Sequence, residues 1–362
     1  MVPGRGRGAL RPVRGARRGA GAGARLHRRR PEPRRTRTRP SRLPRALGGG
    51  PGPHGRPVRT VDRPRPRPPR PRPRPRREPP LSSPIALDYS EQERWLRQSA
   101  ARNAERDRRL AAEFAVAGYD RAADIGCGAG GMAAALKSAR PGAAVLAVDS
   151  DAAVLDIARS YAAEHGADLD FRTADLDAGA EAIRDALGGP VDLVWAGHVV
   201  HHAVDQQAAL DALAANLRPG GRMAVAEGGL GARILPWDIG FGRPGLHARL
   251  ETAGSLRMEA ENAERGAVPM PYGWTRALRL AGLRDIETRT EFIDRPAPLA
   301  GGDLTEALDS LAARVEWFGD FLDGEDRDVW QALLDPADSH WLGNRDDLHH
   351  WEIRTVYTGR RA

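Results

Sequence analysis

The chain has 362 residues, a net charge of +8 and 41% hydrophobic residues, a length that allows two or three domains. No stretch approaches the roughly 18 consecutive apolar residues of a membrane-spanning helix, so we expect no membrane partner. The single cysteine, Cys127, excludes an intrachain disulfide and a cysteine-rich metal site. A lone cysteine is typical of a reducing compartment, and we expect a cytoplasmic protein.

Residues 1–80 differ sharply in composition from the rest of the chain. They hold 26 arginines, no lysine, three acidic residues and 18 of the 29 prolines. Residues 81–362 then carry 30 basic and 45 acidic residues, a net charge of −15. An Arg/Pro/Gly-rich segment has almost no apolar surface to bury, so we expect residues 1–80 to form a disordered tail.

Two interpretations of this tail remain open. An arginine-rich arm can bind nucleic acid through its phosphates, and the acidic charge of the remaining chain restricts any such contact to residues 1–80. Alternatively, Lys137 is the only lysine, which suggests a GC-rich coding sequence. Translation of GC-rich sequence upstream of a misplaced start would produce the same composition without a function.

The segment at residues 81–118 is expected to be an N-terminal helical lid. It is polar and alanine-rich, and a sparse apolar face contains Trp95, Leu96, Leu110 and Phe114. From residue 119 onwards, apolar strands alternate with helical segments, which predicts a parallel α/β sheet.

A glycine-rich turn follows the first predicted strand. Gly126, Gly128 and Gly130 allow positive φ angles and a close ligand approach. The helix that begins after them directs unpaired N–H groups at the turn, which favours an anionic ligand group. Cys127 lies between two glycines where a small side chain is required, so we include it in the ligand-binding turn but do not interpret it as a nucleophile.

The spacing of Gly126, Gly128 and Gly131 also fits the dinucleotide-binding fingerprint G-x-G-x-x-G. The acid Asp124, two residues before the first glycine, favours another interpretation, because a dinucleotide-binding strand usually stays apolar there. The run Asp-x-Gly-x-Gly-x-Gly resembles motif I of the class I S-adenosylmethionine-dependent methyltransferases. The resemblance implies that the turn holds the methionine half of the cofactor and that Asp124 acts through water or the amino group.

Acids follow the second and third predicted strands. Asp149 ends the strand at residues 143–148, and one carboxylate can accept from both hydroxyls of a ribose. We include its neighbour Ser150 in the cofactor site, whereas Asp151 is expected to cap the next helix. By resemblance, Asp175 accepts from the adenine amino group, and Leu176 lies beside the ring.

The fourth predicted strand, residues 191–196, ends in Trp195 and Ala196. In the family that it resembles, this segment lies beside the sulfonium and the transferred methyl group. His198 follows and is our candidate general base for an oxygen or nitrogen acceptor. His201 and His202 are expected to pack structurally, and no carboxylate lies at ligand spacing, so we expect no metal.

The turn Pro219-Gly220-Gly221 before the fifth strand is a second resemblance to class I methyltransferases, and the match covers about residues 120–228. It implies a Rossmann-like, doubly wound α/β fold with a seven-stranded, mostly parallel sheet. We expect residues 119–362 to form this methyltransferase domain, with cap insertions at about 229–273 and 295–348. Aromatic residues of the cap region either stack on a planar acceptor or fold the cap: Trp237, Phe241, Tyr272 and Trp274.

The sequence therefore predicts an enzyme that uses S-adenosyl-L-methionine to methylate a small-molecule acceptor. One alternative is an NAD(P)-dependent oxidoreductase, although the single lysine, Lys137, leaves no Tyr-x-x-x-Lys pair. Another is a non-catalytic cofactor-binding module with an RNA-binding arm. The identity of the acceptor and the oligomeric state stay open.

Overall fold

The computed structural model describes residues 89–362, with side chains from residue 93 onwards. The predicted tail at residues 1–80 and the first part of the predicted lid lie outside the described residues. Within residues 89–362, each helix is too short or too polar to cross a membrane.

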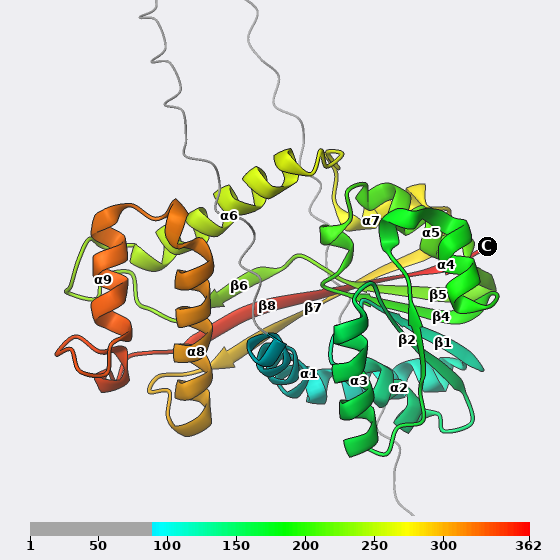
Figure 1. Cartoon of the computed structure of the whole chain (residues 1–362), viewed down its shortest axis with the longest axis horizontal. Helices are drawn as coiled ribbons and strands as arrows, with labels where there is room; N and C mark the ends of the chain where they lie inside the picture. Colours follow the sequence, from blue (N-terminus) through cyan, green and yellow to red (C-terminus); the bar gives the residue numbers. More distant parts are fainter. Residues whose placement is uncertain (1–88) are drawn as a thin grey trace, which may run out of the picture. The chain divides into compact units, whose positions relative to one another are not determined.

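A mixed sheet organises the described part of the chain, with the order β3-β2-β1-β4-β5-β8-β6 and with β7 pairing β8 (Figure 1). The first five strands are parallel, whereas β8 runs antiparallel to its neighbours. This architecture confirms the predicted Rossmann-like α/β fold. The strands are β1 (Arg121–Ile125), β2 (Ala144–Asp149), β3 (Asp170–Thr173), β4 (Val191–Gly197), β5 (Leu217–Ala226), β6 (Leu230–Arg233), β7 (Leu283–Arg295) and β8 (His350–Arg361).

The prediction of seven strands is wrong, because the described sheet has eight. The additional strand, β6, lies in the first expected cap insertion and pairs with the outer part of β8. Gly229, at a φ of 99°, permits this pairing, since a Cβ there would lie 2.2 Å from the carbonyl oxygen of Ile353. Only a glycine lets the chain pass so close to β8.

Helices cover both faces of the sheet, as Figure 1 shows. One layer packs on the core that contains Leu136, Leu155 and Trp195, and the other packs on the core that contains Leu210, Leu213 and Leu278. The central strands are buried on both faces, which explains their continuous apolar sequence. The first layer consists of α1 (Tyr89–Ala117), α2 (Gly131–Ala139) and α3 (Ala152–Glu164), and the second of α4 (Gly179–Leu187), α5 (Gln206–Ala215) and α7 (Trp274–Leu280).

A second assembly, here called the cap, surrounds the outer halves of β7 and β8. It contains β6, α6 (Leu246–Glu264), α8 (Gly301–Phe318) and α9 (Gly324–Leu334). Its own apolar core includes the fully buried side chains of Ile234, Leu250 and Trp330. The inner half of β8 pairs with β5 and its outer half pairs with β6, so one continuous strand joins the two cores.

Candidate active site

A cavity of about 490 Å³ lies at the carboxyl ends of the parallel strands, beneath α1. Open α/β sheets bind ligands at this edge. Ten of the predicted site residues line the cavity: Asp124, Gly126, Cys127, Gly128, Asp149, Ser150, Asp175, Leu176, Trp195 and His198.

Two predicted residues, Gly130 and Ala196, do not line the cavity. Gly130 is the N-cap of α2, and its α-carbon faces Ala158 of α3. Ala196 is fully buried in the core that α4, α5 and α7 cover. Successive side chains of a strand point to opposite faces, so Trp195 on the cavity side directs Ala196 away from it.

The glycine turn has the backbone conformation that its sequence predicts. Gly126 and Gly128 have φ angles of 64° and 53°. The Cys127 amide donates to the carbonyl of Val148 at 3.0 Å, which ties the turn to β2. A Cβ on Gly126 would lie 2.3 Å from Val199 Cγ2, so the turn packs directly against the segment after β4.

Asp124 connects this turn to the following helix. Its side chain is only 2% exposed, and Oδ2 accepts from the Ala133 amide at 2.9 Å. Burial raises the pKa of this carboxyl well above its ordinary value, and the nearby Asp107 raises it further. Asp124 therefore fixes the first turn of α2, whose N–H groups face the cavity.

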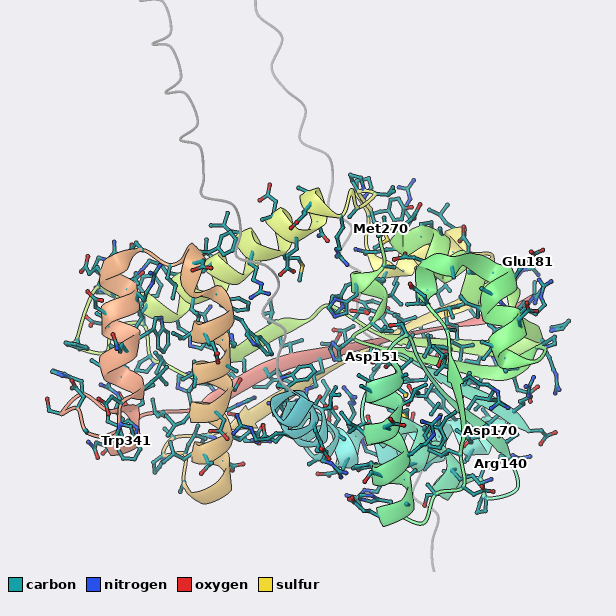
Figure 2. All side chains as sticks on the ribbon, in the orientation of Figure 1. Arg140, Asp151, Asp170, Glu181, Met270 and Trp341 are labelled. Carbon is teal, nitrogen blue, oxygen red and sulfur yellow. The ribbon has the colours of Figure 1, made fainter. Side chains whose placement is uncertain are left out.

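Asp149 at the end of β2 accepts two backbone hydrogen bonds. Its Oδ2 accepts from the Gly128 amide and its Oδ1 from the Asp151 amide, both at 3.2 Å. Partial burial raises the pKa of the Asp149 carboxyl. The predicted helix cap is confirmed, because Asp151 accepts from the Ala153 amide at 2.8 Å at the start of α3 (Figure 2).

The neighbouring strand, β3, supplies a second acid to the same edge. Asp175 is exposed, and Oδ1 accepts from the Asp177 amide at 2.9 Å at the start of a short 3-10 helix, Leu176–Ala178. Leu176 packs partly against the apolar core and also lines the cavity. Asp149 therefore ends β2 and Asp175 follows the adjacent parallel strand β3, as predicted.

Sequence reasoning missed an ion pair on α1, Arg106 with Asp107. Both side chains are buried, at 9% and 4% exposure, and both line the cavity. Arg106 Nη2 lies 2.8 Å from Asp107 Oδ1, and the guanidinium lies 5.7 Å from the centre of the Trp195 ring. Helical spacing could have indicated that this pair is buried, because Asn103, Arg106 and Asp107 share one helix face with the buried Leu110.

His198 follows β4 with a φ of 55°, and its amide donates to the carbonyl of Ala226 at 2.9 Å. Its side chain is exposed to the cavity, where desolvation by the surrounding protein lowers the pKa of the imidazole. His202 also lines the cavity and is exposed, and its ring lies 4.0 Å from that of His201, centre to centre. His201 instead contacts a buried carboxylate, with 2.8 Å between its Nδ1 and Oε2 of Glu227, a residue that sequence reasoning missed.

The aromatic residues of the cap region do not line this cavity. Trp237 is 69% exposed, and Phe241 stacks on His340 with 3.8 Å between the ring centres. Tyr272 donates from its hydroxyl to Gln207, and Trp274 packs against the core. Of the two interpretations of these aromatic residues, stacking on an acceptor therefore does not apply within this cavity.

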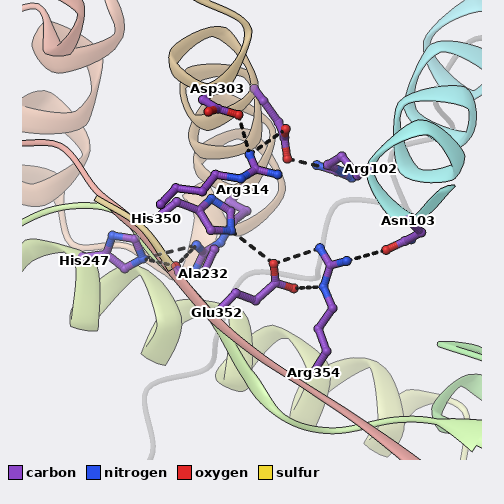
Figure 3. A network of polar contacts seen from close by, with 11 residues as sticks. Arg102, Asn103, Ala232, His247, Asp303, Arg314, His350, Glu352 and Arg354 are labelled. Atoms are coloured by element: carbon purple, nitrogen blue, oxygen red, sulfur yellow. Dashed lines mark hydrogen bonds and ion pairs between the residues drawn. The ribbon is translucent and has the colours of Figure 1, made fainter. Parts of the chain in front are cut away.

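Polar contacts hold α1 against the cap (Figure 3). Arg354 of β8 donates to Asn103 Oδ1 at 2.7 Å and also pairs with Glu352. Arg102 lies 4.0 Å from Glu306 of α8. Through these contacts, α1, whose residues line the cavity, joins the sheet to the cap.

Residues 123–223 match the family model described as "Methyltransferase domain". This match shows a region similar to a methyltransferase domain, on a sheet with the predicted Rossmann-like strand order, and it confirms the resemblance to methyltransferases seen in the sequence. The matched region contains motif I, both acids and the segment after β4.

Curated relatives carry the name "Ubiquinone biosynthesis O-methyltransferase". The protein of Brucella ovis is 38% identical over 103 residues, 28% of this chain and 39% of that protein. The protein of Chelativorans sp. is 34% identical over 144 residues, 40% of this chain and 51% of that protein. This chain therefore spans about two fifths to one half of the length of these relatives.

A solved structure of an O-methyltransferase family protein from Burkholderia thailandensis is also similar to this chain. It is 14% identical with a TM-score of 0.44, and the match covers 76% of this chain and 61% of that one.

Proposed function

We propose that the chain is an S-adenosylmethionine-dependent methyltransferase that acts on a small-molecule acceptor. One observation carries the proposal: a single cavity of about 490 Å³ is lined by the glycine turn, Asp149, Asp175 and His198. The methyltransferase-domain match over residues 123–223 supports it.

The residues around the cavity fit the chemistry of this cofactor. Asp149 offers paired acceptors for a ribose, and Leu176 offers an apolar surface beside Asp175 for an adenine. The amino end of α2 and the Arg106 guanidinium provide positive potential for the methionine carboxylate. When bound, the cofactor supplies an electrophilic methyl group on a sulfonium.

We assign the acceptor to the part of the cavity between α1 and the segment after β4. Trp95, Asn103, His198 and His202 line it. His198 has a lowered pKa and is therefore neutral near pH 7, in the form that accepts a proton from a hydroxyl acceptor. The name O-methyltransferase in the relatives from Brucella ovis and Chelativorans sp. supports an oxygen acceptor.

Alignment of the acceptor and exclusion of water are the protein's other tasks. We propose that α1 acts as the lid, because its residues Leu96, Ala100 and Asp107 form one wall of the cavity. The cap then limits the access of water to the cavity from the side of α8. A cytoplasmic location is part of the proposal and is supported by the single cysteine, Cys127.

Calorimetric titration of the full chain with S-adenosylmethionine, S-adenosylhomocysteine and NADH tests the proposal. We expect both sulfur compounds to bind and NADH not to bind. Binding of NADH alone would overturn the proposal in favour of an oxidoreductase. Incubation with methyl-labelled cofactor and a panel of phenols, carboxylic acids and amines then identifies the acceptor class by the label transferred.

A further inference from the structure

Glu227, at the carboxyl end of β5, is the most completely buried carboxylate beside the cavity apart from Asp124, at 2% exposure. Its Oε1 accepts from the amides of Val199 at 2.9 Å and Val200 at 2.8 Å. Its Oε2 lies 2.8 Å from Nδ1 of His201. A buried charged group is stable only when it is hydrogen-bonded. The segment after β4 provides these hydrogen bonds to the Glu227 carboxylate.

The segment that Glu227 holds carries His198 in an unusual conformation. His198 has a φ of 55°, which costs free energy in a residue with a Cβ and persists only where the surroundings impose it. The Glu227 bonds to the two amides that follow His198 are such a constraint. Val199 in turn packs against Gly126, so the same segment also contacts the glycine turn.

We infer that Glu227 is a positioning residue, whose carboxylate fixes the turn at residues 198–202 so that His198 faces the acceptor in the cavity. The inference rests on the proposed function, because it assigns to His198 the role of base. Glu227 does not itself line the cavity, and it acts through Val199, Val200 and His201.

The charge of Glu227 has a second consequence for His198. Arg106 of α1, Arg354 of β8 and His201 of the same turn all lower the pKa of the His198 imidazole, as does desolvation. Glu227 opposes them, because its negative charge favours the protonated imidazole. Removal of that charge therefore lowers the pKa of His198 further.

The experiment follows the His198 imidazole by NMR during a pH titration of the full ¹⁵N-labelled chain. Glu227→Gln keeps an oxygen acceptor for the Val199 and Val200 amides but removes the charge. We expect the pKa of His198 to fall in this variant. It should stay unchanged in the control Glu113→Gln, because Glu113 of α1 does not line the cavity and pairs with Arg289 of β7. Glu227→Ala removes the acceptor as well as the charge, and an unchanged His198 titration in both Glu227 variants overturns the inference.

Hydrogen exchange of the folded chain tests the positioning directly. In Glu227→Ala the Val199 and Val200 amides lose a charged acceptor, and we expect them to exchange at least about tenfold faster than in wild type. Equal exchange overturns the inference. Titration with S-adenosylhomocysteine separates the two proposals, since wild-type chain that fails to bind it contradicts the proposed function, whereas altered His198 behaviour is measured without any ligand.

Discussion

The carboxylate of Asp149 accepts a hydrogen bond from the Gly128 amide over 3.2 Å. The end of β2 and the glycine turn after β1 are therefore one connected unit, although 20 residues separate them in the chain. The same carboxylate also accepts from the Asp151 amide at the start of α3. A substitution at Asp149 thus affects both the proposed ribose contact and the geometry of the turn.

Asp149→Ala is expected to weaken S-adenosylhomocysteine binding by about 1.5–3 kcal/mol, the range for hydrogen bonds to a charged group. This corresponds to a roughly 10- to 150-fold higher dissociation constant by calorimetry. Asp156→Ala is the control, because Asp156 is exposed on α3 and pairs with Arg159 of the same helix. Unchanged affinity in Asp149→Ala would remove Asp149 from the cofactor site.

Gly126→Ala is expected to destabilise the fold, because the new Cβ would lie 2.3 Å from Val199 Cγ2 at a φ of 64°. Gly166 is a matched control with a φ of 63° and nothing within 4 Å of a new Cβ. We expect about 1–2 kcal/mol of destabilisation for Gly166→Ala from backbone strain, and about 1–3 kcal/mol more for Gly126→Ala from overpacking. Urea unfolding measures both, and equal values would contradict the close packing of the turn on Val199.

Arg106→Met is expected to destabilise the chain by about 3–5 kcal/mol, because it leaves the buried Asp107 carboxylate without its partner beside Asp124. The double variant Arg106→Met/Asp107→Leu removes both charges, and most of the stability should return. Urea unfolding of Arg106→Met, Asp107→Leu and the double variant gives the coupling energy. Additive effects would show that the pair is not coupled.

His247 in the cap makes stability depend on pH. Its side chain is 2% exposed, and burial lowers the pKa of the imidazole to about 3. The unfolded chain binds this proton near the ordinary pKa of about 6.5, so stability is full above that pH and decreases as the pH falls towards 3.

Between pH 7 and pH 5, this single group should remove about 2 kcal/mol of unfolding free energy. We expect His247→Gln, which cannot titrate, to lose about that much less stability than wild type over the same interval. Urea unfolding at the two pH values measures the difference. The same loss in both proteins would contradict a neutral, buried His247.

Many residues of the proposed cofactor site could be predicted from the sequence, because each is marked by a pattern in its immediate neighbours. Gly126, Gly128, Asp149 and Asp175 each lie within a few residues of a strand end, and parallel strands bring these ends to one edge. The position of Ala196 outside the cavity lining has a local cause too, since the alternation along β4 that directs Trp195 to the cavity also directs its neighbour away.

By itself, the sequence determined the fold class, the glycine turn and the acids around it, because strand and helix periodicity and glycine spacing are properties of neighbouring residues. Only the tertiary structure decided that Arg106 and Asp107 reach the cavity, that Glu227 holds the segment carrying His198, and that β6 extends the sheet. These contacts join residues far apart in the chain. Their geometry depends on how helices and strands pack, which no local pattern specifies.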